Sequence, residues 1–304
     1  MLRVAFFGQS SSYSLAAWKH VFSKQDMYQI VAVVEGRTTP VYGLKHRLRQ
    51  GRVKTSPKDD TQLAGVVASC GIDVLQTCDV NDALVIRFIK HAQIDRVVCV
   101  GFHTLFSQEL LQVSRLGGLN AHPSKLPLYR GPSPIFWQLR EGVHASSVTI
   151  HALDAHEDHG EIYAQSAWTI PKRATGEEIY KQAGDLAGRM LAPLLTRFGR
   201  SEEVRTHTQF HAQATRARRP KPEDALIVPR DWTVAHVIDF ATGAPFFRTP
   251  WFRFGEAVFF ARTGLESRVG EKLPGDYVVL DDLLYVQCLD GVAVVLIQTE
   301  PRES

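Results

Sequence analysis

The stretch that decides the fold is "LRVAFFG", residues 2–8, a short apolar run that ends in glycine. The same kind of run returns at residues 28–35, "YQIVAVVE", and at residues 95–102, "DRVVCVGF", after segments that are compatible with helices. Continuous runs rich in valine and isoleucine are typical of parallel strands that helices cover on both faces. The first hundred residues therefore predict an α/β domain built on a parallel sheet.

Further elements follow from the same kind of pattern. Residues 175–199 predict a long helix, because Thr175 and Glu178 have the spacing of a capping box and Gly199 stands where the helix should end. The other predicted elements nearby are an amphipathic helix at residues 82–93 and strands at residues 146–154 and 160–170.

The chain changes character after residue 200. Residues 201–224 are polar and carry no apolar periodicity, so they predict a linker. A predicted helix at residues 233–243 then precedes several short strand-like runs, which "PG" and "DG" turns separate. We therefore expect residues 1–200 to form a catalytic domain and residues 225–304 a small β-rich domain.

The composition is that of an ordinary globular protein. The 304 residues carry a formal net charge of +3 with a pI near 8.6, which permits a nucleic-acid partner without demanding one. The four cysteines show no CxxC pair and no zinc spacing, so they predict free thiols in a reducing cytoplasm. No apolar run is long enough for a membrane span, and the N-terminus is too quickly polar for a signal peptide. We expect a cytoplasmic protein with neither a membrane nor DNA as its partner.

The turn after the first apolar run, "GQSSS" at residues 8–12, excludes three common sites. It lacks the second and third glycines of the GxGxxG dinucleotide motif. It is neither a P-loop nor the G-x-S-x-G elbow that carries the nucleophile of α/β-hydrolases. The polar residues that could perform chemistry gather elsewhere, in two clusters.

The first cluster lies in "LNAHPSKLPLYRGPSPIFWQ", residues 119–138. Asn120, His122 and Ser124 alternate, as side chains do when they share one face at the end of a strand. The prolines that follow fix the backbone of the next loop. A rigid loop with polar side chains is a frequent place for a functional site.

The second cluster is "HALDAHEDHGE", residues 151–161. Its histidines and acids suggest a metal site, but the H-E-x-x-H spacing is missing, and residues i and i+5 are not expected to converge at the end of a strand. The alternatives are a solvated polar loop and a loop that contributes one catalytic carboxylate. We predict no metal.

Together the two clusters offer an asparagine, a histidine and an aspartate, without a serine or cysteine nucleophile. A carboxylate raises the pKa of a neighbouring histidine and fixes its tautomer. An asparagine amide donates a hydrogen bond to a developing oxyanion. This set predicts direct acyl transfer, in which the amine of the acceptor attacks while the protein stabilises the oxyanion and moves the proton.

The segment "NAHPSKLPLYRG", with "DAHEDHGEI" downstream, resembles the formyltransferase family that uses 10-formyltetrahydrofolate. That family combines an asparagine-x-histidine pair with an S-x-L-P-x-x-x-G loop and a downstream D-x-G. Residues 274–295 resemble the small barrel-like domain of methionyl-tRNA formyltransferases and their relatives. The fixed elements of the motif are all present: Asn120, His122, Ser124, Leu126, Pro127, Gly131, Asp158 and Gly160.

The resemblance implies a Rossmann-like domain with a mostly parallel sheet, followed by a small OB-like barrel. It also implies that the donor is 10-formyltetrahydrofolate. Asn120 and His122 would polarise the formyl carbonyl, and Asp158 would hold His122 and move the proton of the attacking amine. The turn of Gly8, Gln9 and Ser10 would face the acceptor. Folate contacts are expected from Phe102, Leu105, Ser124, Leu126, Pro127, Gly131, Asp154 and Gly160.

The acceptor is open at this point. An aminoacyl-tRNA comes first by domain plan. However, the "GQS" turn departs from the G-T-P-x-F-A of relatives that act on initiator tRNA, and residues 36–54 are basic but built differently from their glycine-rich loop. The "HPS" form resembles relatives that act on amino sugars, and "GQS" and "HPS" together resemble the hydrolase module of formyltetrahydrofolate dehydrogenase. A small amine, such as a nucleotide-linked amino sugar or a hydroxylated amino acid, is therefore the second acceptor, and water the third.

Outside enzymes, the alternative is a non-catalytic relative that binds RNA through "RARRPK", residues 216–221. The intact set of Asn120, His122 and Asp158 argues against it, because RNA binding does not require these residues.

Overall fold

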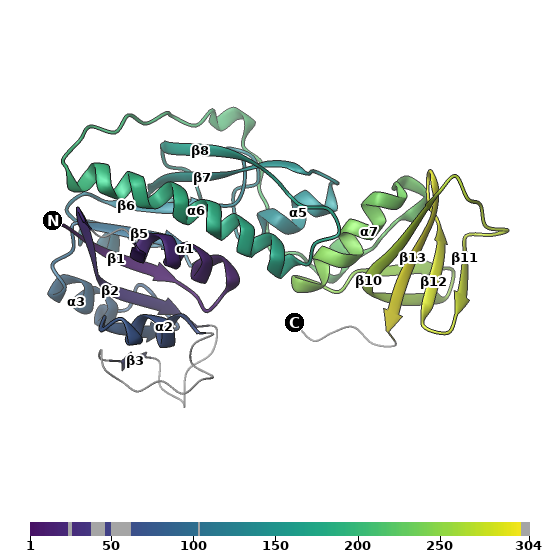
Figure 1. The fold of residues 1–304 in the computed structure, drawn as a ribbon, viewed down its shortest axis with the longest axis horizontal. Coiled ribbons are helices and arrows are strands. Elements are labelled where there is room, and N and C mark those ends of the chain that lie inside the picture. Colours follow the sequence, from purple (N-terminus) through teal and green to yellow (C-terminus); the bar gives the residue numbers. More distant parts are fainter. Residues whose placement is uncertain (24–25, 38–45, 50–61, 103, 299–304) are drawn as a thin grey trace. The chain divides into compact units, whose positions relative to one another are not determined.

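The computed structural model of the chain describes residues 1–23, 26–37, 46–49, 62–102 and 104–298 (Figure 1). Backbone contacts divide the chain into two compact units. Within the described ranges, no helix is both long and apolar enough to cross a membrane. The first unit consists of residues 1–130, 147–168 and 180–216, and the second of residues 131–146, 169–179 and 217–304.

The first unit is built on an eight-stranded sheet. Its strands are β1 (Leu2–Gly8), β2 (Tyr28–Gly36), β3 (His46–Arg49), β4 (Val74–Thr77), β5 (Arg96–Val100), β6 (Gly118–His122), β7 (Ala145–Leu153) and β8 (Ile162–Thr169). They lie in the order β3-β4-β2-β1-β5-β6-β7-β8. The strands from β4 to β6 pair in parallel, whereas β3 and β7 run antiparallel to their neighbours β4 and β6. The prediction of a mostly parallel α/β sheet is confirmed.

Strand β1 shows why its sequence is apolar at nearly every position. Val4 and Phe6 belong to one hydrophobic cluster, and Ala5 and Phe7 belong to another. Successive side chains of a strand point to opposite faces, so a strand that is covered on both sides needs apolar residues throughout. The helices that contribute to the first cluster are α1 (Ser12–Ser23), α2 (Leu63–Ser69) and α6 (Gly176–Gly199), and those of the second are α3 (Ala83–His91) and α4 (Gln108–Gln112).

The predicted helix at residues 175–199 is confirmed as α6. The Glu178 carboxylate accepts a hydrogen bond from the backbone N–H of Thr175, and the Thr175 hydroxyl accepts one from the backbone N–H of Glu178. This is the reciprocal pattern of a capping box. The helix ends at Gly199, as its sequence indicated. The predicted helix at residues 82–93 and the predicted strands around residues 150 and 165 are present as α3, β7 and β8.

The second unit contains a five-stranded antiparallel sheet. Its strands lie in the order β11-β12-β13-β10-β9 and, as Figure 1 shows, the sheet curls into a half-barrel. The small β-rich C-terminal part is therefore confirmed. The bounds are β9 (Trp251–Phe254), β10 (Ala257–Val269), β11 (Tyr277–Leu280), β12 (Leu283–Gln287) and β13 (Gly291–Gln298), and the unit also holds the helices α5 (Pro134–Arg140) and α7 (Val234–Gly243).

Residues 201–224, which were predicted as a linker, are shared between the two units. The part up to residue 216 belongs to the first unit, where His207 forms an antiparallel bridge with Ile162 and Arg216 a parallel bridge with Arg130. The part from residue 217 belongs to the second unit. The proposed division into residues 1–200, a linker and residues 225–304 stays a prediction about which parts of the chain fold independently.

Candidate active site

The candidate site starts on two neighbouring strands of the first unit. Asn120 and His122 lie two residues apart on β6, so their side chains leave the same face of the sheet. The antiparallel register places His151 of β7 opposite Asn120, and Thr149 opposite His122. Directly opposed residues of an antiparallel pair are close neighbours on one face. The register therefore gathers four polar side chains on one face of the sheet.

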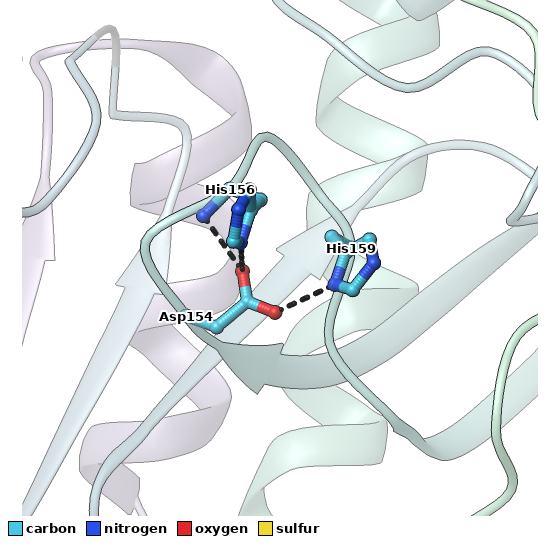
Figure 2. A group of neighbouring side chains, drawn as sticks. All are labelled: Asp154, His156 and His159. Atoms are coloured by element: carbon cyan, nitrogen blue, oxygen red, sulfur yellow. Dashed lines mark hydrogen bonds and ion pairs between the residues drawn. The ribbon is translucent and has the colours of Figure 1, made fainter. Parts of the chain in front are cut away.

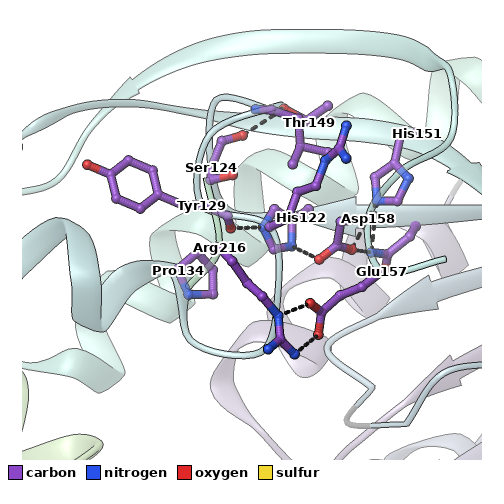
Figure 3. A network of polar contacts seen from close by, with 12 residues as sticks. His122, Ser124, Tyr129, Pro134, Thr149, His151, Glu157, Asp158 and Arg216 are labelled. Carbon is purple, nitrogen blue, oxygen red and sulfur yellow. Dashed lines mark hydrogen bonds and ion pairs between the residues drawn. The ribbon is translucent and has the colours of Figure 1, made fainter. Parts of the chain in front are cut away.

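Asp158 reaches these side chains from the loop that follows β7, and its side chain is 13% exposed. Its Oδ1 accepts a hydrogen bond from the Asn120 amide at 3.1 Å and lies 3.3 Å from Nε2 of His151. Its Oδ2 lies 3.4 Å from Nδ1 of His122. Figure 3 shows the carboxylate between the two imidazoles. The structure thus brings together the three residues that the sequence singled out, and adds His151.

The far nitrogen of each imidazole is bound to a backbone carbonyl. Nε2 of His122 donates to the carbonyl of Tyr129 and Nδ1 of His151 donates to that of Ala152, each at 2.8 Å. Because a carbonyl oxygen only accepts, these two nitrogens carry the protons. In a neutral imidazole the other ring nitrogen carries a lone pair, and in both histidines this nitrogen faces Asp158. An ionised carboxylate also only accepts, so the contacts between these three groups require at least one further proton that they share.

Burial has the larger effect on His122. It lowers the pKa of the imidazole below the ordinary 6.5, because a charged ring is poorly solvated in the interior. Asp158 acts in the opposite direction, as expected from the sequence, and the Tyr129 carbonyl also raises the pKa. The net direction is downward, which favours a neutral His122 with a lone pair toward Asp158.

The loop after β6 is fixed by hydrogen bonds from β7. Ser124 is fully buried, and its hydroxyl donates to the carbonyl of Leu128 at 2.7 Å. The Thr149 hydroxyl donates to the carbonyl of Ser124 at 2.7 Å and accepts from the backbone N–H of Leu126 at 3.4 Å. Ser124 and the buried Leu126 therefore hold the loop that carries the Tyr129 carbonyl, and through it the His122 ring.

Gly160 allows the loop of Asp158 to close onto β7. A Cβ atom at this position would lie 2.1 Å from the carbonyl oxygen of Ala152, closer than real Cβ contacts. The side-chain amide of Gln209 adds two hydrogen bonds, to the carbonyls of Asp158 at 3.0 Å and Gly160 at 2.7 Å. The glycine of the D-x-G motif is therefore required by a close backbone approach.

Comparison with known proteins places this geometry in a family. The profile of the formyl transferase family matches residues 2–195. A methionyl-tRNA formyltransferase of Chloroflexus aggregans is 31% identical over 237 residues, which cover 78% of this chain and 71% of that protein. The chain belongs to the formyl transferase family.

Solved structures share the fold of this family member. A methionyl-tRNA formyltransferase from Clostridium thermocellum matches with a TM-score of 0.58 at 14% identity, over 98% of this chain and 99% of that chain. An N-formyltransferase from Helicobacter canadensis, solved with folinic acid and dTDP-3-aminofucose, matches with a TM-score of 0.61 at 12% identity, over 98% and 99% of the two chains. At these identities the likeness shows the fold alone.

The turn of Gly8, Gln9 and Ser10 leads from β1 of this formyltransferase into α1. The backbone N–H of Gln9 donates to the Ser14 hydroxyl at 3.1 Å. The Ser10 hydroxyl donates to Glu35, a fully buried carboxylate at the end of β2. The turn thus lies at the carboxyl edge of the sheet with its serine bound to Glu35. Its predicted contact with the acceptor stays a prediction.

The predicted pterin contacts Phe102 and Leu105 differ in their surroundings. Phe102 packs edge to face against Phe7 and Phe106, with ring centroids 6.1 and 5.7 Å apart. Leu105 keeps 54% of its surface exposed. Phe102 is therefore anchored to the core, and the apolar surface of Leu105 is accessible. Their folate contacts stay predictions.

Pro127 and Gly131 are the remaining motif residues of the loop after β6. Gly131 has a φ of 113°, which favours glycine, and it is the first residue of the second unit. The backbone carbonyl of Pro127 accepts a hydrogen bond from the backbone N–H of Thr215 at 3.3 Å. Their folate contacts stay predictions as well. Most of the basic stretch at residues 36–54 and His103 lie outside the described residues.

One expectation about the second cluster is wrong. Residues five apart do converge there, since Nδ1 of His159 lies 2.9 Å from Oδ2 of Asp154. The reason is a turn in the chain: the backbone N–H of His156 donates to Oδ1 of Asp154 at 2.9 Å and bends the loop back on itself.

Sequence reasoning noticed His151 in the cluster but gave it no part in the site. Its signal was the alternation of Thr149 and His151 along a predicted strand, which puts both side chains on one face. What was missing was the antiparallel register with β6, which sets His151 against Asn120. Gln209 was missed as well, because it lies in the stretch predicted as a linker.

Proposed function

We propose that the chain transfers the formyl group of 10-formyltetrahydrofolate to the amine of an aminoacyl-tRNA of the methionyl kind. The observation that carries the proposal is the Asp158 carboxylate between His122 and His151, with the Asn120 amide on its Oδ1. The donor is supported by family membership and by the folinic acid that the Helicobacter canadensis relative binds. The acceptor is supported by the relative that is a methionyl-tRNA formyltransferase.

In the proposed reaction Asn120 stabilises the formyl oxygen as negative charge develops on it. A neutral amide can donate such a hydrogen bond without being protonated first. Its nitrogen lies 3.1 Å from both Asp158 Oδ1 and His151 Nε2, so a bound formyl oxygen would replace one of these contacts. His122 donates through Nε2 to Tyr129. We therefore assign His122 to holding Asp158 through Nδ1, rather than to polarising the formyl oxygen.

Asp158 moves the proton in this proposal. The amine nitrogen of the acceptor bonds to the formyl carbon, and the bond from that carbon to N10 of the donor breaks. The attacking amine loses one proton and N10 gains one, so a group that accepts and returns a proton balances the reaction. Asp158 fits this part because it can give the proton that it shares with His122 and His151 to N10 and take up the proton of the attacking amine in its place, so that the cluster returns to its first state.

The two segments proposed for the donor also have the composition that a flat folate ring needs. Such sites are mostly apolar and offer a few placed polar groups. Phe102 and Leu105 supply apolar surface after β5, and the loop of residues 154–160 supplies backbone polar groups next to Asp158. We assign the donor to these two segments.

A small amine is the second candidate acceptor. The Helicobacter canadensis relative was solved with an amino-sugar nucleotide, and the "GQS" turn departs from the form of relatives that act on tRNA. The basic residues 216–221 are also partly neutralised. Arg216 forms a bidentate pair with Glu157, drawn in Figure 3, and Arg218 forms one with Asp224.

The test incubates the purified chain with 10-formyltetrahydrofolate and either charged initiator tRNA or nucleotide-linked amino sugars. Mass spectrometry follows the formylated product, and absorbance follows the released tetrahydrofolate. We expect formylated methionyl-tRNA. If an amino sugar is formylated instead, the small amine is the acceptor. Release of tetrahydrofolate without any formylated amine would show hydrolysis of the donor. An unchanged donor would refute the proposal that the chain is an enzyme.

A further inference from the structure

The loop that carries Asp158 also holds three side chains that the proposed reaction does not use as a group. Asp154, His156 and His159 each offer one ligand atom, and these atoms all lie within 4.8 Å of one another. Figure 2 shows the carboxylate of Asp154 directed at both histidines. Two imidazoles and a carboxylate are a common ligand set for zinc and related divalent transition metals.

Two of the three ligands already stand close to the separation that a shared ion requires. Nδ1 of His159 lies 2.9 Å from Oδ2 of Asp154, and a proton now occupies the space between them. Ligand bonds of about 2.0–2.2 Å to one tetrahedral ion place neighbouring ligand atoms about 3.3–3.6 Å apart, so this pair would have to open by about half an ångström. Replacing this proton by a metal ion therefore needs little movement of Asp154 or His159.

The His159 ring is also held from outside the loop. It stacks on the ring of His211 with a centroid distance of 4.1 Å and an angle of 6°. Nδ1 of His211 in turn accepts a hydrogen bond from the Arg130 guanidinium at 2.8 Å. A ligand whose orientation is fixed in advance loses less conformational freedom when it binds an ion.

The third ligand can move to close the site. Nδ1 of His156 lies 4.0 Å from Oδ1 of Asp154, and its side chain is 75% exposed. A rotation of this exposed ring brings a nitrogen to the ion without repacking. The side chains of Asp154 and His159 are 35% and 40% exposed, so an ion can reach the site from solvent, and water can fill the remaining positions.

We propose that Asp154, His156 and His159 bind one divalent transition-metal ion of the zinc class, and that this ion controls the loop of Asp158. The ligands lie on both sides of Asp158 in the chain, so one ion closes the loop around it. The arrangement of Asp158 against His122 and His151 then depends on whether the ion is bound. Metal binding stands on the three ligands alone, whereas its effect on the donor rests on the proposed function.

The first experiment measures Zn²⁺ binding to the untagged full chain by competition with a chromophoric chelator, with Co²⁺ absorption as a second readout. We expect His156→Ala and His159→Ala to weaken Zn²⁺ binding about tenfold or more, since even changes behind the ligands cost 10–100-fold. His91→Ala is the matched control, because His91 is an exposed histidine at the end of α3. All three variants keep the same cysteines, so thiol binding contributes equally. Equal Zn²⁺ affinity in wild type and both loop variants overturns the site.

The second experiment titrates 5-formyltetrahydrofolate with and without Zn²⁺. We expect Zn²⁺ to change the folate affinity of the wild type about fivefold or more, the lower end of the usual coupling between sites, and to leave that of His156→Ala unchanged. If Zn²⁺ binds without any change in folate affinity, the proposal that the ion controls the Asp158 loop is refuted, whereas the metal site itself stands. A chain that binds Zn²⁺ through these residues but no folate would refute the proposed function alone.

Discussion

Asn120 and His151 face each other across β6 and β7, with the amide nitrogen of one 3.1 Å from the imidazole Nε2 of the other. Residues that are 31 positions apart in the chain thus become neighbours through one pairing of strands. The Asp158 carboxylate contacts both members of this pair and also His122. The predictions that follow depend on this cluster and on the loops that hold it.

Replacing Asp158 by asparagine should lower kcat by about 10²–10⁴-fold, because the amide cannot accept and return the proton of the attacking amine. The fold should remain, since the amide is nearly isosteric with the carboxylate. Steady-state kinetics with the accepted amine measure the effect, and circular dichroism checks the fold. Glu157→Gln is the control in the neighbouring position. Near-normal turnover of Asp158→Asn would remove Asp158 from the mechanism.

His151 should act as a positioning residue through Asp158. We expect His151→Gln to lower kcat about tenfold or more, with little change in KM for the donor, and to shift the pH profile of kcat because Asp158 loses one partner of its shared proton. The exposed His207, changed to glutamine, is the control. A variant with reduced kcat but an unshifted pH profile would show that His151 has only a structural part.

His122 should make the protein less stable in mild acid. Its pKa in the folded protein is lowered from 6.5 by burial, so the unfolded chain takes up the proton first as the pH falls. Stability attributable to His122 is therefore lost below pH 6.5, by at most about 1.4 kcal/mol per pH unit. Urea unfolding between pH 7.5 and 5 should show a shallower decline for His122→Gln than for wild type. Parallel declines would mean that His122 is protonated equally in both states.

Gly160→Ala should destabilise the chain by about 1–3 kcal/mol, the range for overpacked positions. The new Cβ would stand 2.1 Å from the Ala152 carbonyl oxygen, so the loop of Asp158 has to move away from β7. Denaturant unfolding gives the free energy. Gly275→Ala is the matched control, because a Cβ at Gly275 meets no atom within 4 Å, and it should stay within about 0.5 kcal/mol of wild type. Equal losses in both variants would contradict the close approach.

A tRNA acceptor predicts salt-dependent RNA binding through residues 216–221. Arg219 and Lys221 should carry more of it than Arg216 and Arg218, because the latter two form close pairs with Glu157 and Asp224, whereas Lys221 has only an exposed contact of 3.8 Å with Glu223. Replacing Arg219 and Lys221 by glutamine should weaken binding and reduce the slope of log affinity against log salt by about one for each phosphate that the variant no longer neutralises. Filter binding with initiator tRNA measures the slope. Absence of RNA affinity at low salt would favour the small amine.

The sequence by itself determined the elements and much of the candidate site. Apolar runs such as residues 2–8 specify strands because only apolar side chains can be buried on both faces. The capping box of Thr175 and Glu178 specifies where α6 begins, because its hydrogen bonds are local. The spacing of Asn120 and His122 puts both side chains on one face for the same local reason, the pleat of a strand.

Only the tertiary structure decided which distant residues meet. The register of β6 against β7 sets His151 opposite Asn120, and the turn at Asp154 brings His159 back to it. The turn is local, since the backbone N–H of His156 closes it on Asp154, whereas the contact of His151 with Asn120 has no local pattern in the sequence, because strand register depends on the whole sheet and its packing. The same holds for the sign of the pKa shift of His122. The sequence indicated a carboxylate that raises this pKa, whereas the depth of burial, which only the folded chain sets, has the larger effect and lowers it.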